Sequence, residues 1–127
     1  MMVDQIDDWR SALDDCAEQL LAEAEIAAPP VDALHLAAVL GFGVAVDDRQ
    51  ACRARQVQLP GCEGDGSPAI LLRPERRVER RQWAVAHEIG EHYAYEVCAR
   101  LGVDPQDLAP GDRERTANAL ANRLLLP

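Results

Sequence analysis

Segments with a helical spacing of apolar residues take up most of this 127-residue chain and leave room for only a small sheet. Apolar side chains recur at three- and four-residue steps from Ile6 to Ala24, which predicts an amphipathic helix over residues 4–27. Further helices are predicted over residues 31–40, 75–101 and 113–126, the last with Asp112 as its N-cap.

Three short segments between the second and third predicted helices have the composition of strands: residues 43–47, 53–59 and 69–73. A sheet this small is stable only when it packs on helices. We therefore expect an α+β fold of N-terminal helices, a small, mainly antiparallel sheet of about three strands, a long helix and a C-terminal helix. The chain length fits a single domain spanning residues 1–127.

The charge balance limits the kinds of partner that the chain can bind. Its net charge is −9, with 22 acidic and 13 basic residues, whereas a general binder of nucleic acid or of an anionic membrane needs a basic face. The N-terminal sequence MMVDQIDDWR lacks the apolar core of a secretory signal, and the four cysteines form no C-x-x-C pair. We expect a cytoplasmic protein with reduced cysteines that contacts neither nucleic acid directly nor a membrane.

Five of the arginines lie around the start of the third predicted helix: Arg73, Arg76, Arg77, Arg80 and Arg81. Glu75 and Glu79 are interleaved with them, so a solvated face with ion pairs along the helix is the interpretation that we favour. The alternative is a docking patch for an acidic partner or for a peptide carboxylate.

The segment with the clearest chemical meaning runs from His87 to His92 and reads H-E-I-G-E-H. In the zinc-peptidase pattern H-E-x-x-H, two histidines four residues apart share one helix face and bind one metal ion, and the glutamate reaches the attacking water. This chain has one more residue between the two histidines. On a regular helix, His92 would therefore lie about 140° from His87, too far round for both to bind one metal.

Two arrangements would restore a metal site. A π-type bulge would bring His92 back to the face of His87, or Glu91, four residues after His87, would replace His92 as the ligand. We favour the bulge, because zinc binds imidazole well and because Gly90 lies in the turn that must deform. Glu88 is in either case the expected general base.

A catalytic zinc ion needs a third protein ligand, and Glu114 in the first turn of the last predicted helix is the candidate. Asn118 lies four residues further on the same face and would orient Glu114 by a hydrogen bond without contacting the metal itself. Glu114 is also explained simply as an acid stabilised by the helix dipole. Tyr93 and Tyr95 follow the motif directly and are candidates either for a donor to the transition state or for packing.

With these residues, the chain resembles the ImmA/IrrE metallopeptidases. Members of that family show a helix that reads A-H-E-I-G-H and a later helix that reads E-x-x-A-N-x-F-A-x-x-L-L-M-P. Here the first motif is Ala86–Gly90 with His92 displaced by one residue, and the second runs from Glu114 to Pro127 with leucine at positions 120 and 126. The run from Pro30 to Val44 is similar to the family's P-V-D helix and the strand that follows it.

The resemblance implies a zinc-dependent, gluzincin-like site with His87, His92 and Glu114 as metal ligands and Glu88 as general base. It also implies a metalloendopeptidase that hydrolyses a peptide bond in a helix-turn-helix transcriptional repressor or similar regulator. Because the last motif ends at Pro127, we expect a minimal catalytic domain. The alternative function is a metal-binding module that binds a repressor or another partner protein without cleaving it.

Overall fold

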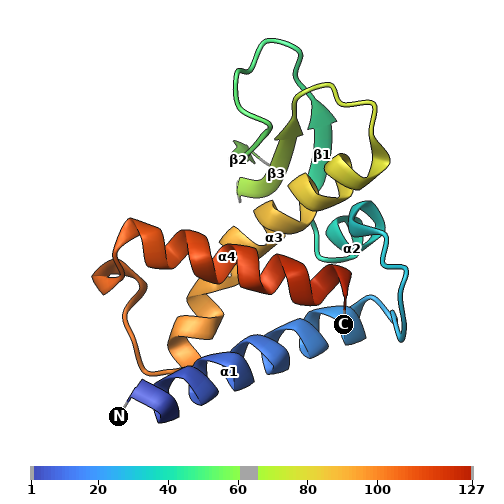
Figure 1. Cartoon of the computed structure of the whole chain (residues 1–127). Helices are drawn as coiled ribbons and strands as arrows, with labels where there is room; N and C mark the ends of the chain where they lie inside the picture. Colours follow the sequence, from blue (N-terminus) through green and yellow to red (C-terminus); the bar gives the residue numbers. More distant parts are fainter. Residues whose placement is uncertain (1, 61–65, 127) are drawn as a thin grey trace.

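The computed structural model describes residues 2–60 and 66–126, and its architecture confirms the predicted α+β class (Figure 1). No helix in this part of the chain is both long enough and apolar enough to cross a membrane. The elements in chain order are α1 (Met2–Glu23), α2 (Ala33–Val39), β1 (Gly43–Val46), β2 (Ala54–Pro60), β3 (Gly66–Leu72), α3 (Val78–Arg100), the short 3-10 helix η1 (Pro105–Asp107) and α4 (Pro110–Leu125).

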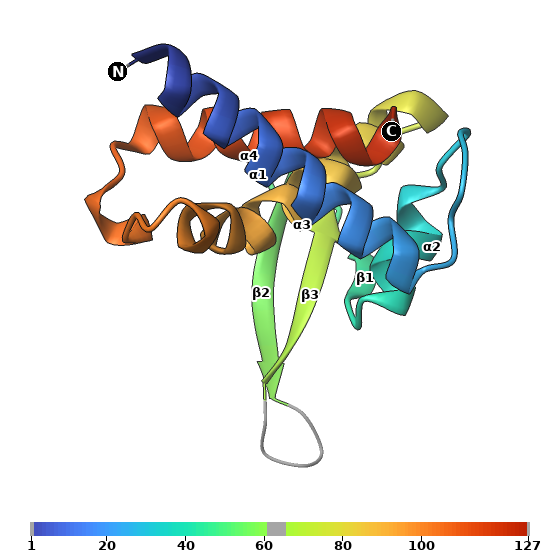
Figure 2. The same cartoon turned by 90° about the horizontal axis from the view of Figure 1, so that it is seen from below.

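The sheet has the strand order β1-β3-β2 and is mixed, whereas the sequence predicted a mainly antiparallel one. β2 and β3 pair antiparallel, and Figure 2 shows them running side by side away from the helices. β1 pairs parallel to β3, with Gly43 opposite Ala69. Spacing along the chain predicts the pairing of neighbouring strands but not the partner of β1, which joins the sheet from the far side. β2 is consequently an edge strand.

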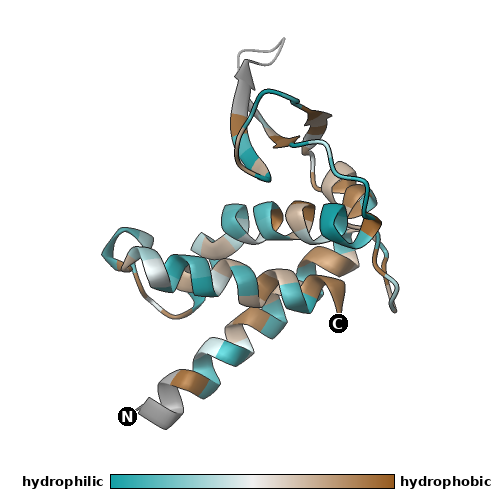
Figure 3. Cartoon of the chain, turned by 45° about the horizontal axis from the view of Figure 1, so that its top comes forward, coloured by the Kyte–Doolittle hydropathy of each residue, from teal (hydrophilic) through white to brown (hydrophobic). Residues whose placement is uncertain are grey.

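The core lies where α1, α3 and α4 pack together. Trp9 on α1 reaches Thr116 on α4, with the indole nitrogen 3.4 Å from the hydroxyl oxygen. Figure 3, in which the ribbon is coloured by hydropathy, shows hydrophilic and hydrophobic stretches alternating along the helices. Fully buried side chains on α1 and α4 keep the predicted helical spacing: Leu13, Cys16, Leu20, Ala117, Leu120, Ala121 and Leu124.

The start of α4 differs from the prediction that Asp112 is its N-cap. The helix begins at Pro110, and Ala109 is the N-cap residue. Proline fits the first helical position because that position needs no amide hydrogen. Asp112 lies in the first turn, where its carboxylate is 3.3 Å from the Arg115 guanidinium.

The crossing of α3 and α4 depends on Gly90. A Cβ atom placed on Gly90 would overlap the backbone carbonyl oxygen of Ala117, so the two helix backbones approach one another more closely than any other residue at this position allows. Because α4 is held there, its first turns lie beside the His87 segment of α3.

Three of the four cysteines lie in the described residues and are free thiols: Cys16 and Cys98 are buried, and Cys52 is exposed. Burial, together with the nearby Glu96 carboxylate, raises the pKa of the Cys16 thiol to about 12. Cys16 and Cys98 therefore act as small core side chains, as expected. Cys62 lies outside the described residues.

Candidate metal centre

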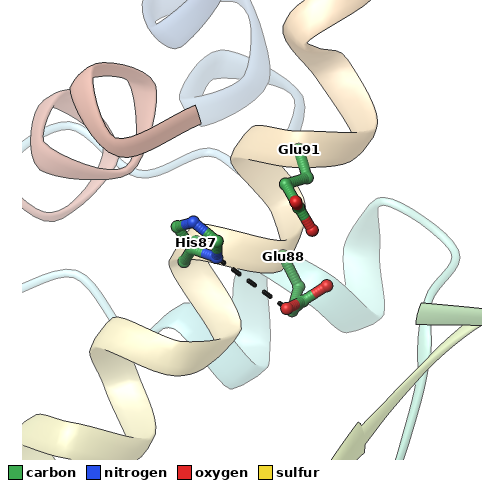
Figure 4. Close-up of side chains that lie close together, drawn as sticks. All are labelled: His87, Glu88 and Glu91. Atoms are coloured by element: carbon green, nitrogen blue, oxygen red, sulfur yellow. Dashed lines mark ion pairs between the residues drawn. The ribbon is translucent and has the colours of Figure 1, made fainter. Parts of the chain in front are cut away.

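Three side chains of α3 lie together at the predicted motif: His87, Glu88 and Glu91 (Figure 4). Each offers one ligand atom, and these atoms all lie within 4.8 Å of one another. His87 and Glu91 are four residues apart, so a regular helix places them on one face. This group can surround a single metal ion.

Glu114 joins the group from α4. Its carboxylate oxygen Oε1 lies 3.0 Å from Nε2 of His87, while the Glu114 side chain remains 56% exposed. The structure therefore brings together two of the residues that the sequence singled out, although 27 positions separate them. The close crossing at Gly90 is the reason that this turn of α4 reaches His87.

Glu88 is the buried acid of the site, only 4% exposed. Its carboxylate lies 3.8 Å from Nδ1 of His87. The Gln56 side-chain amide, on β2, donates to Oε2 of Glu88 at 3.3 Å and also to the Glu88 backbone carbonyl. Gln56 was not among the residues predicted from the sequence, and no local pattern could have revealed it, because only the packing of β2 on α3 creates this contact.

The charges of the site favour a cation. The carboxylate of Glu88, followed by those of Glu114 and Glu91, raises the pKa of His87 against the opposing effect of burial. Partial desolvation and the neighbouring Glu88 raise the pKa of Glu91. Carboxylates that share a small volume resist ionisation together, and a bound cation removes this penalty. One imidazole and several carboxylate oxygens are donors that a divalent metal such as zinc accepts.

The prediction that a π-type bulge brings His92 to the face of His87 is wrong. α3 is a continuous α-helix over Val78–Arg100, without the π-type bulge that would have rotated His92 into the site. The ring of His92 instead packs edge-on against Phe42, with ring centroids 5.0 Å apart. Its burial there lowers the pKa of His92. The regular helix keeps its hydrogen bonds, and aromatic packing holds His92 on a different face, so Glu91 takes the place beside His87.

The other predicted residues lie at different places around the centre. Tyr93 packs its ring against Phe42, as expected for a packing role. Tyr95 is half exposed and borders a cleft that Glu91 also lines. Asn118 lines the cleft around His87, but no hydrogen bond joins it to Glu114 in the described residues, so the expected orienting contact is absent.

Two clefts flank the candidate metal centre: His87 and Glu88 line one, Glu91 lines the other, and Glu114 lines both. One cleft, of about 570 Å³, is enclosed by the start of β2, the end of β3, α3 and α4, and is lined by Arg53, Ala54, Arg73, Trp83, Ala84, His87, Glu88, Glu114 and Asn118. The other, of about 500 Å³, lies between the second half of α3, η1 and the start of α4.

Comparisons with protein-family models, with curated proteins and with solved structures find no match for this chain.

Proposed function

We propose that this protein is a metallopeptidase: a zinc-dependent enzyme that hydrolyses a peptide bond within a protein substrate. The observation that carries the proposal is the buried carboxylate of Glu88, fixed beside His87 in a cleft that Glu114 also lines. A carboxylate next to a metal-binding imidazole on one helix is the arrangement that metal-assisted hydrolysis requires.

In this proposal, His87, Glu91 and Glu114 hold the metal ion. This ligand set departs from the one that the ImmA/IrrE resemblance implies, because Glu91 replaces His92. A zinc ion bound by these residues would act as a Lewis acid toward a substrate carbonyl and would lower the pKa of a water molecule. The carboxylate-rich donor set also suits manganese, so both metals belong in any test.

Glu88 is the general base. It accepts a proton from the water that attacks the carbonyl and returns the proton to the departing amine. Gln56 fixes the orientation of this carboxylate by its amide donor. Among the two tyrosines that follow the motif, Tyr95 borders the neighbouring cleft and is the remaining candidate for a donor to the developing oxyanion.

The substrate is a protein or peptide. β2 is an edge strand whose Gln56 contacts Glu88, so an extended peptide that pairs with β2 would lie beside the centre. A helix-turn-helix repressor or similar regulator, and a cytoplasmic location, are the parts of the proposal that rest on the resemblance and on the sequence.

The test compares the unmodified protein with Glu88→Gln, which keeps the size of the side chain but removes the base. Both are loaded with Zn²⁺ or Mn²⁺, checked for bound metal by elemental analysis, and incubated with a degenerate peptide library that is read by mass spectrometry. We expect equal metal content and a loss of cleavage of about 100-fold or more in the variant. Glu79→Gln is the matched control, since Glu79 is an exposed acid at the start of the same helix.

The outcome also distinguishes the alternative function. Stoichiometric metal with no cleavage by the unmodified protein would favour a metal-binding module that binds a regulator without cutting it. Cleavage that survives Glu88→Gln would contradict the role of Glu88. Failure to bind either metal would overturn both functions.

A further inference from the structure

We infer that Arg53 and Arg73 form a carboxylate-binding subsite in the cleft beside the metal centre, and that the peptide bound there presents an acidic group to them. The two arginines line the same cleft as His87 and Glu88. The inference names the substrate class of the proposed peptidase and rests on it for the position of the reacting bond, but the binding preference is measured without cleavage.

The sheet places the two arginines together. The backbone amide of Arg73 donates to the carbonyl oxygen of Arg53 at 2.9 Å, directly beyond the Ala54–Leu72 pair of the β2–β3 ladder. They therefore leave the same end of two neighbouring strands. The Arg73 guanidinium also donates to the Ala51 carbonyl at 2.9 Å, which uses one of its five donors and restrains the others.

Neither arginine belongs to an ion pair among the described residues, although other arginines nearby do. Arg55 lies 3.4 Å from Asp47, and Arg80 lies 3.9 Å from Glu75. The backbone amide of Arg77 is the main cause of the lowered pKa of Glu75, and Arg53 contributes only after Arg80 and Arg77. Arg53 and Arg73 thus keep guanidinium donors for a ligand.

The cleft has side chains that can bind a cation and others that can bind an anion. Its lining includes His87, Glu88 and Glu114, which offer an imidazole and carboxylates to a cation, and two guanidinium groups, which can bind an anion. Trp83 also lines this cleft, with its ring centroid 6.3 Å from that of His87. A guanidinium pair recognises a carboxylate through paired hydrogen bonds. The carboxylate can come from an acidic side chain or from the free C-terminus of the peptide.

The test measures binding to the Glu88→Gln protein loaded with Zn²⁺, in which hydrolysis is blocked. The probes are short fluorescent peptides with degenerate flanking positions, amidated at the C-terminus, with either glutamate or glutamine at one central position. A third set has the glutamine and a free C-terminus. Fluorescence anisotropy at about 0.1 M salt, where distant charges are largely screened, gives the dissociation constants.

We expect one of the two carboxylate sets to bind about tenfold more tightly than the amidated glutamine set, and the set that does so identifies the source of the carboxylate. The double variant Arg53→Glu, Arg73→Glu should abolish or reverse the preference, and replacing both with lysine should retain part of it. Arg49→Glu is the matched control, because Arg49 is exposed and lies outside the residues that line the cleft.

Equal binding of all three peptide sets, a lack of measurable binding, or a preference that survives the double variant would overturn the inference. Failure of the proposed peptidase has a different signature. In that case the unmodified protein leaves the peptides uncut, while the preference for a carboxylate and its loss in the double variant persist.

Discussion

The imidazole of His87 on α3 lies 3.0 Å from the carboxylate of Glu114 on α4. The contact exists because Gly90 lets the two helices cross with their backbones in close approach. Glu91 and Glu88 complete the group on the α3 side. The candidate metal centre is therefore assembled from two helices, and the donors that it offers are one imidazole and several carboxylate oxygens.

The first prediction concerns the second ligand from α3. Glu91→Ala should weaken binding of Zn²⁺ at least tenfold, because it removes an oxygen donor from the cluster. His92→Ala should leave the metal affinity nearly unchanged, because His92 packs against Phe42. Isothermal titration calorimetry on both variants measures the difference. The opposite result would mean that α3 rearranges to bring His92 to the metal.

The second prediction concerns the helix crossing. Gly90→Ala forces a Cβ atom into the Ala117 carbonyl, and since both groups are held by helix backbone, we expect a loss of about 2 kcal/mol or more in the free energy of unfolding. Gly111→Ala is the control, since nothing lies within 4 Å of the added atom. Thermal unfolding should show a lower Tm for the first variant and an unchanged or slightly higher Tm for the second. Equal Tm values would contradict the close crossing.

The third prediction concerns pH. The surrounding carboxylates raise the pKa of His87 above its ordinary value of 6.5, and burial lowers that of His92 below it. The ion pairs of protonated His87 therefore stabilise the metal-free protein fully below about pH 6.5, and this contribution is lost as the pH rises through the raised pKa. An NMR titration of the metal-free protein should show His87 losing its proton at higher pH than His92.

A metal ion bound to His87 would displace that proton, so Zn²⁺ should bind more weakly as the medium becomes more acidic and should release a proton on binding. Calorimetry in two buffers of different ionisation enthalpy measures the release. A metal affinity that does not change across the His87 titration would exclude His87 as a ligand.

The fourth prediction concerns Gln56, whose side-chain amide donates to Glu88, the proposed general base, and to none of the proposed metal ligands His87, Glu91 and Glu114. Gln56→Leu removes the amide donor to Glu88, and we expect a fall in kcat of about tenfold with little change in Zn²⁺ affinity. Gln106→Leu, at an exposed position on η1, is the control. A loss of metal binding in Gln56→Leu would show instead that the residue supports the fold of the centre.

Much of this structure follows from local pattern. The helical spacing of Leu13, Cys16 and Leu20 places them in the core, and the four-residue spacing of His87 and Glu91 places them on one face of a helix. Such relationships depend only on the geometry of a single helix, which the backbone fixes. The α+β class and the order of the helices and strands are predictable for the same reason.

The sequence by itself therefore determined which residues could hold a metal, and Glu91 was among them. Tertiary structure alone placed Glu91, and not His92, beside His87 and Glu88, because α3 is unbroken and the His92 ring packs on Phe42. Tertiary structure also brought Gln56, Arg53 and Arg73 to the site. Contacts of this kind depend on how distant segments of the chain pack together, so the local spacing of residues does not predict them.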